Sequence, residues 1–177
     1  IDLERFTPGK AEDGLYERYG LPRHAPIVSY IGRLDAEKHL PVLVRAFLRV
    51  QSTHPEAHLL VVGDGTDAAH LKSLVHEFGL QHSVTFTGRV SDEDLVQLHK
   101  VGTVFCMPSP AELQSIATLE AMASGQPVVA VDAGALKELC QHRRNGFLCQ
   151  QDDDEQIADG LSRVIDDSAL RAEFAKE

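Results

Sequence analysis

The chain has 177 residues, of which 43% are hydrophobic and 25% are charged, a composition typical of one globular domain. Its formal net charge of −10 argues against a nucleic-acid-binding protein and against a main anchor to an anionic membrane, because both partners favour a surplus of Lys and Arg. No apolar run approaches the roughly 18–20 residues that span a bilayer, and no signal-peptide pattern is seen.

Along the chain, short apolar runs alternate with amphipathic segments. Strands are predicted at residues 27–32, 59–63, 84–86, 103–107, 127–131 and 147–149. Helices are predicted at residues 40–50, 67–78, 92–101 with Ser91 as N-cap, from Ser115 onward, 135–140, 153–166 and 168–176. The continuously apolar run 59–63 is typical of a central parallel strand. The alternation predicts an α/β fold with a Rossmann-like, doubly wound parallel sheet of about six strands.

The two ends of the chain predict a domain cut from a longer protein. Residues 1–6 contain no initiator Met, and residues 174–177 stop within a helical pattern.

The most informative segment is residues 108–127, which read PSPAELQSIATLEAMASGQP. Glu112 follows a predicted strand, and Glu120 lies eight positions later in a helix-forming stretch. Ser115 between them can act as an N-cap by accepting from a backbone N–H of the first turn. A helix N-terminus favours phosphate. Two carboxylates around it could therefore grip hydroxyls on either side of a diphosphate, which is the layout of a nucleotide sugar.

Further candidate residues follow the other predicted strands, and ligands bind at the carboxyl ends of strands in such sheets. Gly32 would let the backbone approach a ligand, while Arg33 and Lys38 could bind phosphate oxygens or be solvated loop charges. The glycine at position 63 fits either close packing or a simple turn. The later segment Gly88-Arg89-Val90 could present its backbone to a base edge or form a tight turn.

Each carboxylate also has a non-functional interpretation: Glu112 could be an exposed acid in a loop, and Glu120 could be an acid on a helix surface. Leu119, Ala121 and Met122 surround Glu120 in the sequence. A carboxylate among apolar neighbours needs partners. Lys38, Arg33 or ligand hydroxyls could supply them.

No metal site or disulfide framework is predicted. The nine histidines show no HxxxH or HxH spacing, and Cys106, Cys140 and Cys149 show no CxxC spacing. Three unpaired cysteines predict a reducing, cytoplasmic location.

The order and spacing of these motifs resemble the C-terminal, donor-binding domain of retaining glycosyltransferases with the GT-B fold, the group that includes glycogen-synthase-like enzymes. The matching segments are residues 2–6, 32–38, 61–65, 86–90, 108–109, the Glu112/Glu120 pair with residues 121–125, 127–130 and 145–148. On this resemblance, residues 1–177 form one half of a GT-B fold. The acceptor, a lipid or a glycan, would bind mainly to an N-terminal domain outside this chain.

The resemblance implies a role for each matching position. Arg33 and Lys38 would neutralise the donor diphosphate, Glu112 would hold hydroxyls of the transferred sugar, and Glu120 would bind the ribose. Backbone at Arg89 and Val90 would contact the base. Amides of the segment Leu113, Gln114, Ser115, Ile116, Ala117 and Thr118 would lie near the sugar and phosphates. No metal cofactor is implied, and membrane association would come only through the missing domain, at the inner face of the membrane.

Two departures from the family pattern stand out. Leu113-Gln114-Ser115 replaces the Gly-Phe-Gly of many relatives, which leaves the donor sugar open, and Gly134-Ala135 replaces a Gly-Gly pair. Two other functions compete: a sugar-nucleotide epimerase or hydrolase, for which the sequence shows no His–carboxylate constellation, and a non-catalytic nucleotide-binding module, which has no need of all four charged residues. We expect the isolated chain to bind a nucleoside diphosphate and to turn over little.

Overall fold

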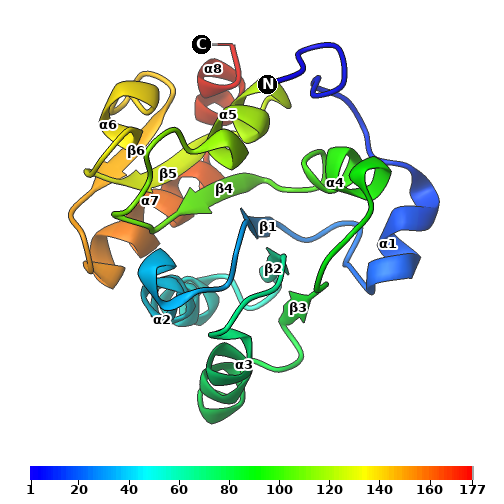
Figure 1. The fold of residues 1–177 in the computed structure, drawn as a ribbon, viewed down its shortest axis with the longest axis vertical. Coiled ribbons are helices and arrows are strands. Elements are labelled where there is room, and N and C mark those ends of the chain that lie inside the picture. Colours follow the sequence, from blue (N-terminus) through cyan, green and yellow to red (C-terminus); the bar gives the residue numbers. More distant parts are fainter. Residues whose placement is uncertain (177) are drawn as a thin grey trace.

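The computed structural model describes residues 1–176, which form a six-stranded sheet in the order β3-β2-β1-β4-β5-β6 (Figure 1). All five strand pairings are parallel. The strands are β1 (Ile27–Ile31), β2 (His58–Val62), β3 (Val84–Phe86), β4 (Val104–Met107), β5 (Val128–Val131) and β6 (Gly146–Cys149). This is the strand order of the doubly wound Rossmann sheet. The predicted fold class and the strand number are therefore confirmed.

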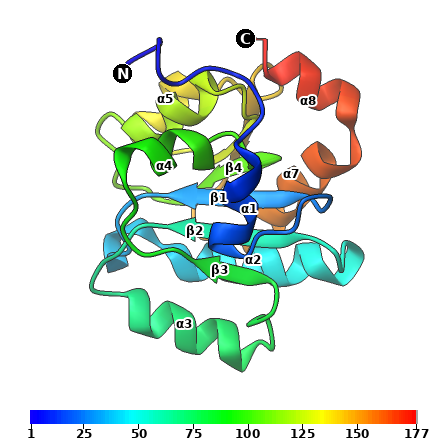
Figure 2. The ribbon, with the colours of Figure 1, turned by 90° about the vertical axis from the view of Figure 1, so that its right-hand side faces the viewer.

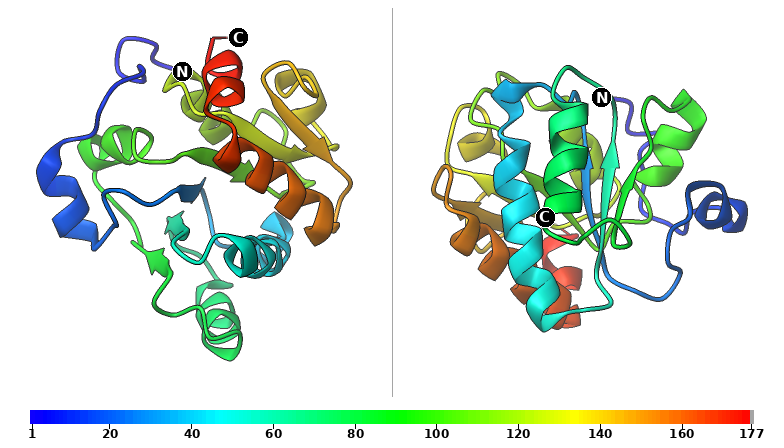
Figure 3. Two further views of the ribbon diagram at one scale, coloured as in Figure 1. Left: turned by 180° about the vertical axis from the view of Figure 1, so that it is seen from behind. Right: turned by 90° about the horizontal axis from the view of Figure 1, so that it is seen from below.

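Helices cover both faces of the sheet. They are α1 (Asp13–Tyr19), α2 (Leu40–Thr53), α3 (Ala68–Glu77), α4 (Asp92–Leu98), α5 (Ile116–Ala123), α6 (Leu136–Leu139), α7 (Asp154–Asp166) and α8 (Ser168–Phe174). Helices α2, α3 and α7 pack on one face, and α4, α5 and α6 on the other (Figures 1 and 3). The chain changes face after β3. The sheet therefore has its topological switch point between β1 and β4, where a ligand crevice is expected.

The central strands form because nearly all of their residues are apolar, with Ser29 of β1 and His58 of β2 as the exceptions. Every residue of β1, β2, β4 and β5 is buried, whereas the three residues of edge strand β3 are only partly buried. Figure 2 shows β4, β1, β2 and β3 stacked in that order, with α3 beyond β3. The prediction of a central strand near residues 59–63 is confirmed, since β2 lies between β1 and β3.

Two short elements were not predicted. Helix α1 buries only Leu15 and contains Gly14, so it lacks an apolar face; Arg18 and Tyr19 instead bind Asp94 of α4. A 3-10 helix at Ala36–Lys38 precedes α2 and buries no residue. Both elements depend on polar contacts with distant segments, which hydrophobic periodicity does not reveal.

The predicted helix N-cap at residue 91 depends on neighbouring residues only, and the structure confirms it. The Ser91 hydroxyl accepts from the Asp94 N–H at 3.1 Å, which confirms Ser91 as the N-cap of α4. Cys106, Cys140 and Cys149 are free and buried. No helix within residues 1–176 is both long and apolar enough to cross a membrane.

An ion pair between α2 and α7 predicts a pH dependence of stability. The His54 side chain, 12% exposed, contacts Asp166 Oδ1 at 2.7 Å, and this hydrogen bond raises the pKa of His54 above 6.5. The pair therefore stabilises the fold fully below pH 6.5, and this contribution is lost as pH rises through the folded-state pKa. We expect Asp166→Asn to lower the free energy of unfolding by about 0.5 kcal/mol at about pH 6 and to have little effect at about pH 9.

Urea unfolding at the two pH values measures this effect. Asp159→Asn is the control, because Asp159 lies on the same helix with similar exposure but pairs with Arg163, which does not titrate in this range. Burial lowers the pKa of His58, but that contribution is the same in wild type and variant. A pH-independent effect of Asp166→Asn would contradict the assignment.

Candidate functional site

Two cavities lie side by side at the carboxyl end of β1. The Glu112 cavity, of about 680 Å³, is lined by the end of β1, the 3-10 helix and the loop after β4. The Arg89 cavity, of about 700 Å³, is lined by the ends of β1 and β2 and the loop after β3. Ile31, Gly32 and Arg33 line both cavities, so the two form one crevice at the switch point of the sheet.

Most of the residues singled out from the sequence line this crevice. The Glu112 cavity is lined by Gly32, Arg33, Lys38, Glu112, Leu113, Gln114, Ser115, Ile116 and Ala117. The Arg89 cavity is lined by Gly32, Arg33, Gly63, Arg89 and Val90. The structure does not place Gly88, Thr118 or Glu120 on either cavity wall.

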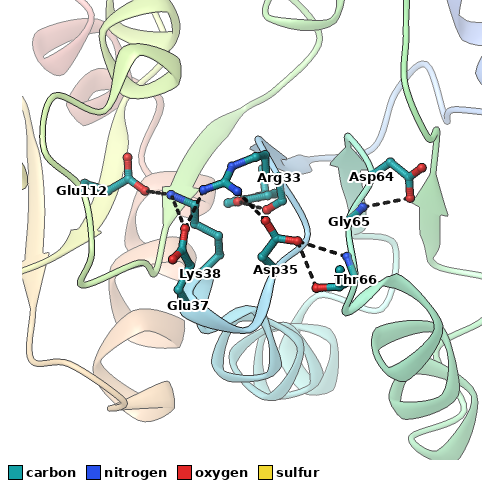
Figure 4. A network of polar contacts seen from close by, with 9 residues as sticks. Arg33, Asp35, Glu37, Lys38, Asp64, Gly65, Thr66 and Glu112 are labelled. Carbon is teal, nitrogen blue, oxygen red and sulfur yellow. Dashed lines mark hydrogen bonds and ion pairs between the residues drawn. The ribbon is translucent and has the colours of Figure 1, made fainter.

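Lys38 and Glu112 form a nearly buried ion pair (Figure 4). Lys38 Nζ lies 2.6 Å from Glu112 Oε1, and the two side chains are 13% and 10% exposed. Glu37 is a weaker second partner of Lys38 at 4.0 Å. A charge at such low exposure requires its counter-charge, so Lys38 and Glu112 fix each other at the wall of the cavity.

Arg33 is anchored from one side and open on the other. Its guanidinium donates to Asp35 at 2.7 Å and Glu37 at 2.6 Å, yet the side chain stays 67% exposed. Asp35 also accepts from the N–H and the hydroxyl of Thr66, and the backbone N–H bond is the main cause of the lowered pKa of Asp35. The Tyr30 hydroxyl donates to the Arg33 carbonyl at 2.8 Å, and burial raises the pKa of Tyr30.

The sequence analysis did not predict that Asp35, Glu37 and Thr66 anchor Arg33. Asp35 and Glu37 do lie between the cations Arg33 and Lys38 in the sequence, but this pattern is equally typical of a solvated charged loop. Thr66 contributes from the loop after β2, which no short-range pattern connects with Asp35.

Gly63 is explained by backbone packing and needs no ligand. A Cβ at Gly63 would lie 1.9 Å from the Gly32 carbonyl oxygen. The N–H of Gly63 donates to the Gly88 carbonyl at 3.0 Å, and the Leu34 N–H donates to the Asp64 carbonyl at 3.0 Å. Of the two alternatives left open for Gly63, close packing of the strand ends is therefore the one observed.

Ser115 begins α5, but it does not cap the helix as predicted. It has φ 49° and ψ 61°, the left-handed region, and its hydroxyl contacts the Thr118 hydroxyl at 2.7 Å. This correction has a physical cause, since the left-handed backbone turns the hydroxyl away from the first-turn N–H groups. The amides of Ile116 and Ala117 donate to no group within residues 1–176, and both residues line the Glu112 cavity. Free amides at a helix N-terminus bind anions.

The loop bearing Glu112 is held by Gly134 and Ala135. The Ala135 N–H donates to the Glu112 carbonyl at 3.0 Å, and a Cβ at Gly134 would lie 2.4 Å from the same oxygen. Gly134 also has φ 49°. Only the first residue of this pair must therefore be glycine, which explains how Ala135 is accommodated.

We expect Gly134→Ala to lower the free energy of unfolding by about 2 kcal/mol, because it adds backbone strain and a clash with the Glu112 carbonyl. Urea denaturation measures the loss. The control is Ala135→Gly, which keeps the N–H donor and adds no atom, and which we expect to cost under about 1 kcal/mol. Equal effects of both changes would contradict this account of the loop.

Glu120 contacts neither predicted cation. Its carboxylate, 15% exposed, lies 3.4 Å from Nε2 of the fully buried His99. Lys38 is bound to Glu112 and Arg33 to Asp35 and Glu37, so of the three partners left open for Glu120, neither cation is the one observed. This proximity could not be read from the sequence, because His99 is the C-cap of α4 and Glu120 lies in α5.

The side chains of the described residues were compared with the clusters that hold metal ions in proteins. Within residues 1–176, no group of three or more His, Cys, Asp or Glu side chains is arranged to hold a metal ion. The charged groups of the crevice wall are the cations Arg33, Lys38 and Arg89 and the carboxylates of Asp35, Glu37, Asp64 and Glu112.

Fold and site together define an α/β domain with a crevice, lined by cations and free amides, at the switch point of a Rossmann-like sheet. Residues 15–177 match the family model described as glycosyl transferases group 1, and the chain belongs to this family. The architecture is accordingly one half of the GT-B fold, as expected.

Individual relatives agree with this assignment. A D-inositol 3-phosphate glycosyltransferase of Salinispora arenicola is 33% identical over 190 residues, covering 99% of this chain and 42% of the relative. The C-terminal domain of a group 1 family protein (LpcC) from Francisella tularensis superposes with a TM-score of 0.87 at 27% identity, covering 99% of this chain and 93% of that one. Anabaena Alr3699/HepE, solved in complex with UDP-glucose, gives a TM-score of 0.87 at 26% identity and covers 99% and 48% of the two chains.

Proposed function

We propose that this chain is the donor-binding half of a retaining glycosyltransferase and that its crevice binds a nucleotide-diphosphate sugar. The observation that carries the proposal is the convergence of Arg33, Lys38 and the free amides of Ile116 and Ala117 on one cavity beside Glu112. The UDP-glucose complex of the Anabaena protein supports it, since that chain shares the fold over the full length of this one.

In this proposal the diphosphate lies between the two cations and the start of α5. Arg33 and Lys38 offset the negative charge that grows on the leaving nucleoside diphosphate as its bond to the sugar breaks. The amides of Ile116 and Ala117 add donors that are already in place. Charge stabilisation by side chains and amides needs no bound metal, so we propose that the reaction uses no metal cofactor.

The two carboxylates hold hydroxyl groups in this proposal. Glu112, held in place by Lys38, accepts from the transferred sugar. Glu120, which lies off both cavity walls but is 15% exposed, accepts from the ribose. The base occupies the Arg89 cavity, where the backbone of Arg89 and Val90 reads its edge. Leu113 and Gln114 line the sugar end and, with Ser115, would shape the choice of sugar.

The acceptor, a lipid or a glycan, is proposed to bind a separate N-terminal domain. The chain spans 42% of its Salinispora relative and 45% of a GDP-mannose-dependent mannosyltransferase of Mycobacterium tuberculosis. We accordingly expect the 177-residue chain to bind donor but to turn over little unaided. The cytoplasm, or the inner face of its membrane, is the proposed location.

Titration calorimetry of the 177-residue chain with UDP, GDP and ADP tests the proposal. We expect one base to bind most tightly, and Arg33→Ala to weaken that affinity about 10- to 100-fold through loss of charge-assisted hydrogen bonds to phosphate. Arg163→Ala is the matched control, because Arg163 is 54% exposed and ion-paired on α7, outside the crevice. Comparable affinity for all three nucleotides, unaffected by Arg33→Ala, would overturn the donor-site assignment.

A further inference from the structure

His99, at the end of α4, is fully buried between aromatic rings. Its side chain is 0% exposed. The Phe6 ring lies 5.4 Å away and nearly perpendicular, at 86°, and the Phe105 ring lies 6.2 Å away. Because these rings pack around the imidazole, its orientation is fixed.

The polar atoms of this imidazole are unsatisfied. Neither Nδ1 nor Nε2 of His99 has a hydrogen-bond partner within residues 1–176. Nε2 nevertheless lies 3.4 Å from Glu120 Oε2, close in distance but without hydrogen-bond alignment. An unpaired buried donor is costly, so a small rotation of the Glu120 carboxylate that completes this bond is favourable.

We propose that His99 is a positioning residue for Glu120. The N–H at Nε2 donates to Oε2 and holds the carboxylate, while Oε1 accepts from the nucleotide ribose. The inference rests on the proposed function, in which Glu120 binds the ribose. Buried as it is, His99 does not touch the nucleotide and acts only through Glu120.

The position of α4 strengthens the inference. This helix follows the loop of Arg89 and Val90, is capped by Ser91, and ends with His99 at its C-cap beside Glu120. One short helix thus connects the proposed base loop with the proposed ribose clamp. A nucleotide would therefore place its base at Arg89 and Val90 and its ribose at Glu120, two contacts whose spacing the helix fixes.

Calorimetry measures the affinity of UDP, GDP and ADP and of their 2′,3′-dideoxy forms. The test uses the nucleotide that binds most tightly and takes the ratio of the affinities of its two forms as the preference for the ribose hydroxyls. In wild type we expect the ribose hydroxyls to strengthen binding. In His99→Phe, which keeps the aromatic packing but removes the donor, we expect this preference for the hydroxyls to fall roughly tenfold. His99→Gln keeps an N–H donor and should retain the preference; His99→Leu serves as the second donor-free variant if the Phe variant does not fold.

Comparing the Glu120 and His99 variants distinguishes failure of the proposed ribose role of Glu120 from failure of the positioning role of His99. If Glu120→Leu, which removes the acceptor, leaves the hydroxyl preference unchanged, the ribose role in the proposed function is wrong. If Glu120→Leu abolishes the preference but a folded donor-free variant of His99 keeps it, only the role of His99 is overturned. Equal weakening of both nucleotide forms in His99→Phe would show a general packing effect and would also overturn the positioning role.

Discussion

Replacing Lys38 with Met is expected to weaken nucleoside diphosphate binding by about 100-fold, because it removes a nearly buried cation that we propose faces the phosphates. Its side chain is 13% exposed and ion-paired with Glu112, so water screens it little. The loss leaves the Glu112 charge uncompensated beside the bound anion. Calorimetry with the tightest-binding nucleotide measures the effect.

The same substitution is expected to lower the free energy of unfolding by about 3 kcal/mol, since breaking a buried pair leaves a lone charge. Adding Glu112→Gln separates the two effects. The double variant should regain stability but not affinity, because the phosphates still lack their cation. Lys72→Met is the matched control: it makes the same charge change on α3, where Lys72 lies over the Phe86 ring. Full affinity in Lys38→Met would refute the proposed phosphate role.

The second large effect is expected at Gly63. A methyl group there would lie 1.9 Å from the Gly32 carbonyl oxygen, and the backbone at φ 127° is unfavourable for any side chain. We expect Gly63→Ala to lower the free energy of unfolding by about 3 kcal/mol, because both backbones must move apart. Urea denaturation and the unfolding midpoint measure the loss.

Gly14→Ala is the comparison for Gly63→Ala. Gly14 lies in α1, and a Cβ there would meet nothing within 4 Å. We expect this change to leave stability unchanged or to raise it by about 0.5 kcal/mol through helix propensity. A similar loss at both glycines would mean that the close backbone approach at Gly63 does not limit stability.

The sheet could be predicted because burial on both faces leaves a local mark in the sequence. The continuously apolar residues 59–63 coincide with β2 (His58–Val62) except at its ends, and Ser91 precedes α4 as a local capping signal. Parallel pairing of such runs then brings the loops of Arg33, Gly63 and Glu112 to one edge. The crevice thus follows from topology and a few charged positions.

The partners inside the site could not be predicted, because they depend on exact packing between distant segments. Glu112 could not be assigned to Lys38 from spacing alone, since 74 positions separate them. Ser115 looked like an ordinary N-cap, and only the left-handed turn imposed by the preceding loop redirects its hydroxyl. His99 gave no signal, because its contact with Glu120 arises where α4 and α5 meet.

The loops after β1, β2 and β3 are joined by backbone hydrogen bonds, with Gly63 bound to Gly88 and Leu34 bound to Asp64. Such a framework does not have to be ordered when a ligand arrives, so association with this side of the crevice carries a small entropic penalty. The loop from residue 108 to 115 is tied to its neighbours through fewer groups, chiefly the carbonyl and carboxylate of Glu112. If the proposed donor site is right, we expect exchange of that loop between related chains to change the recognised sugar while leaving nucleotide affinity intact.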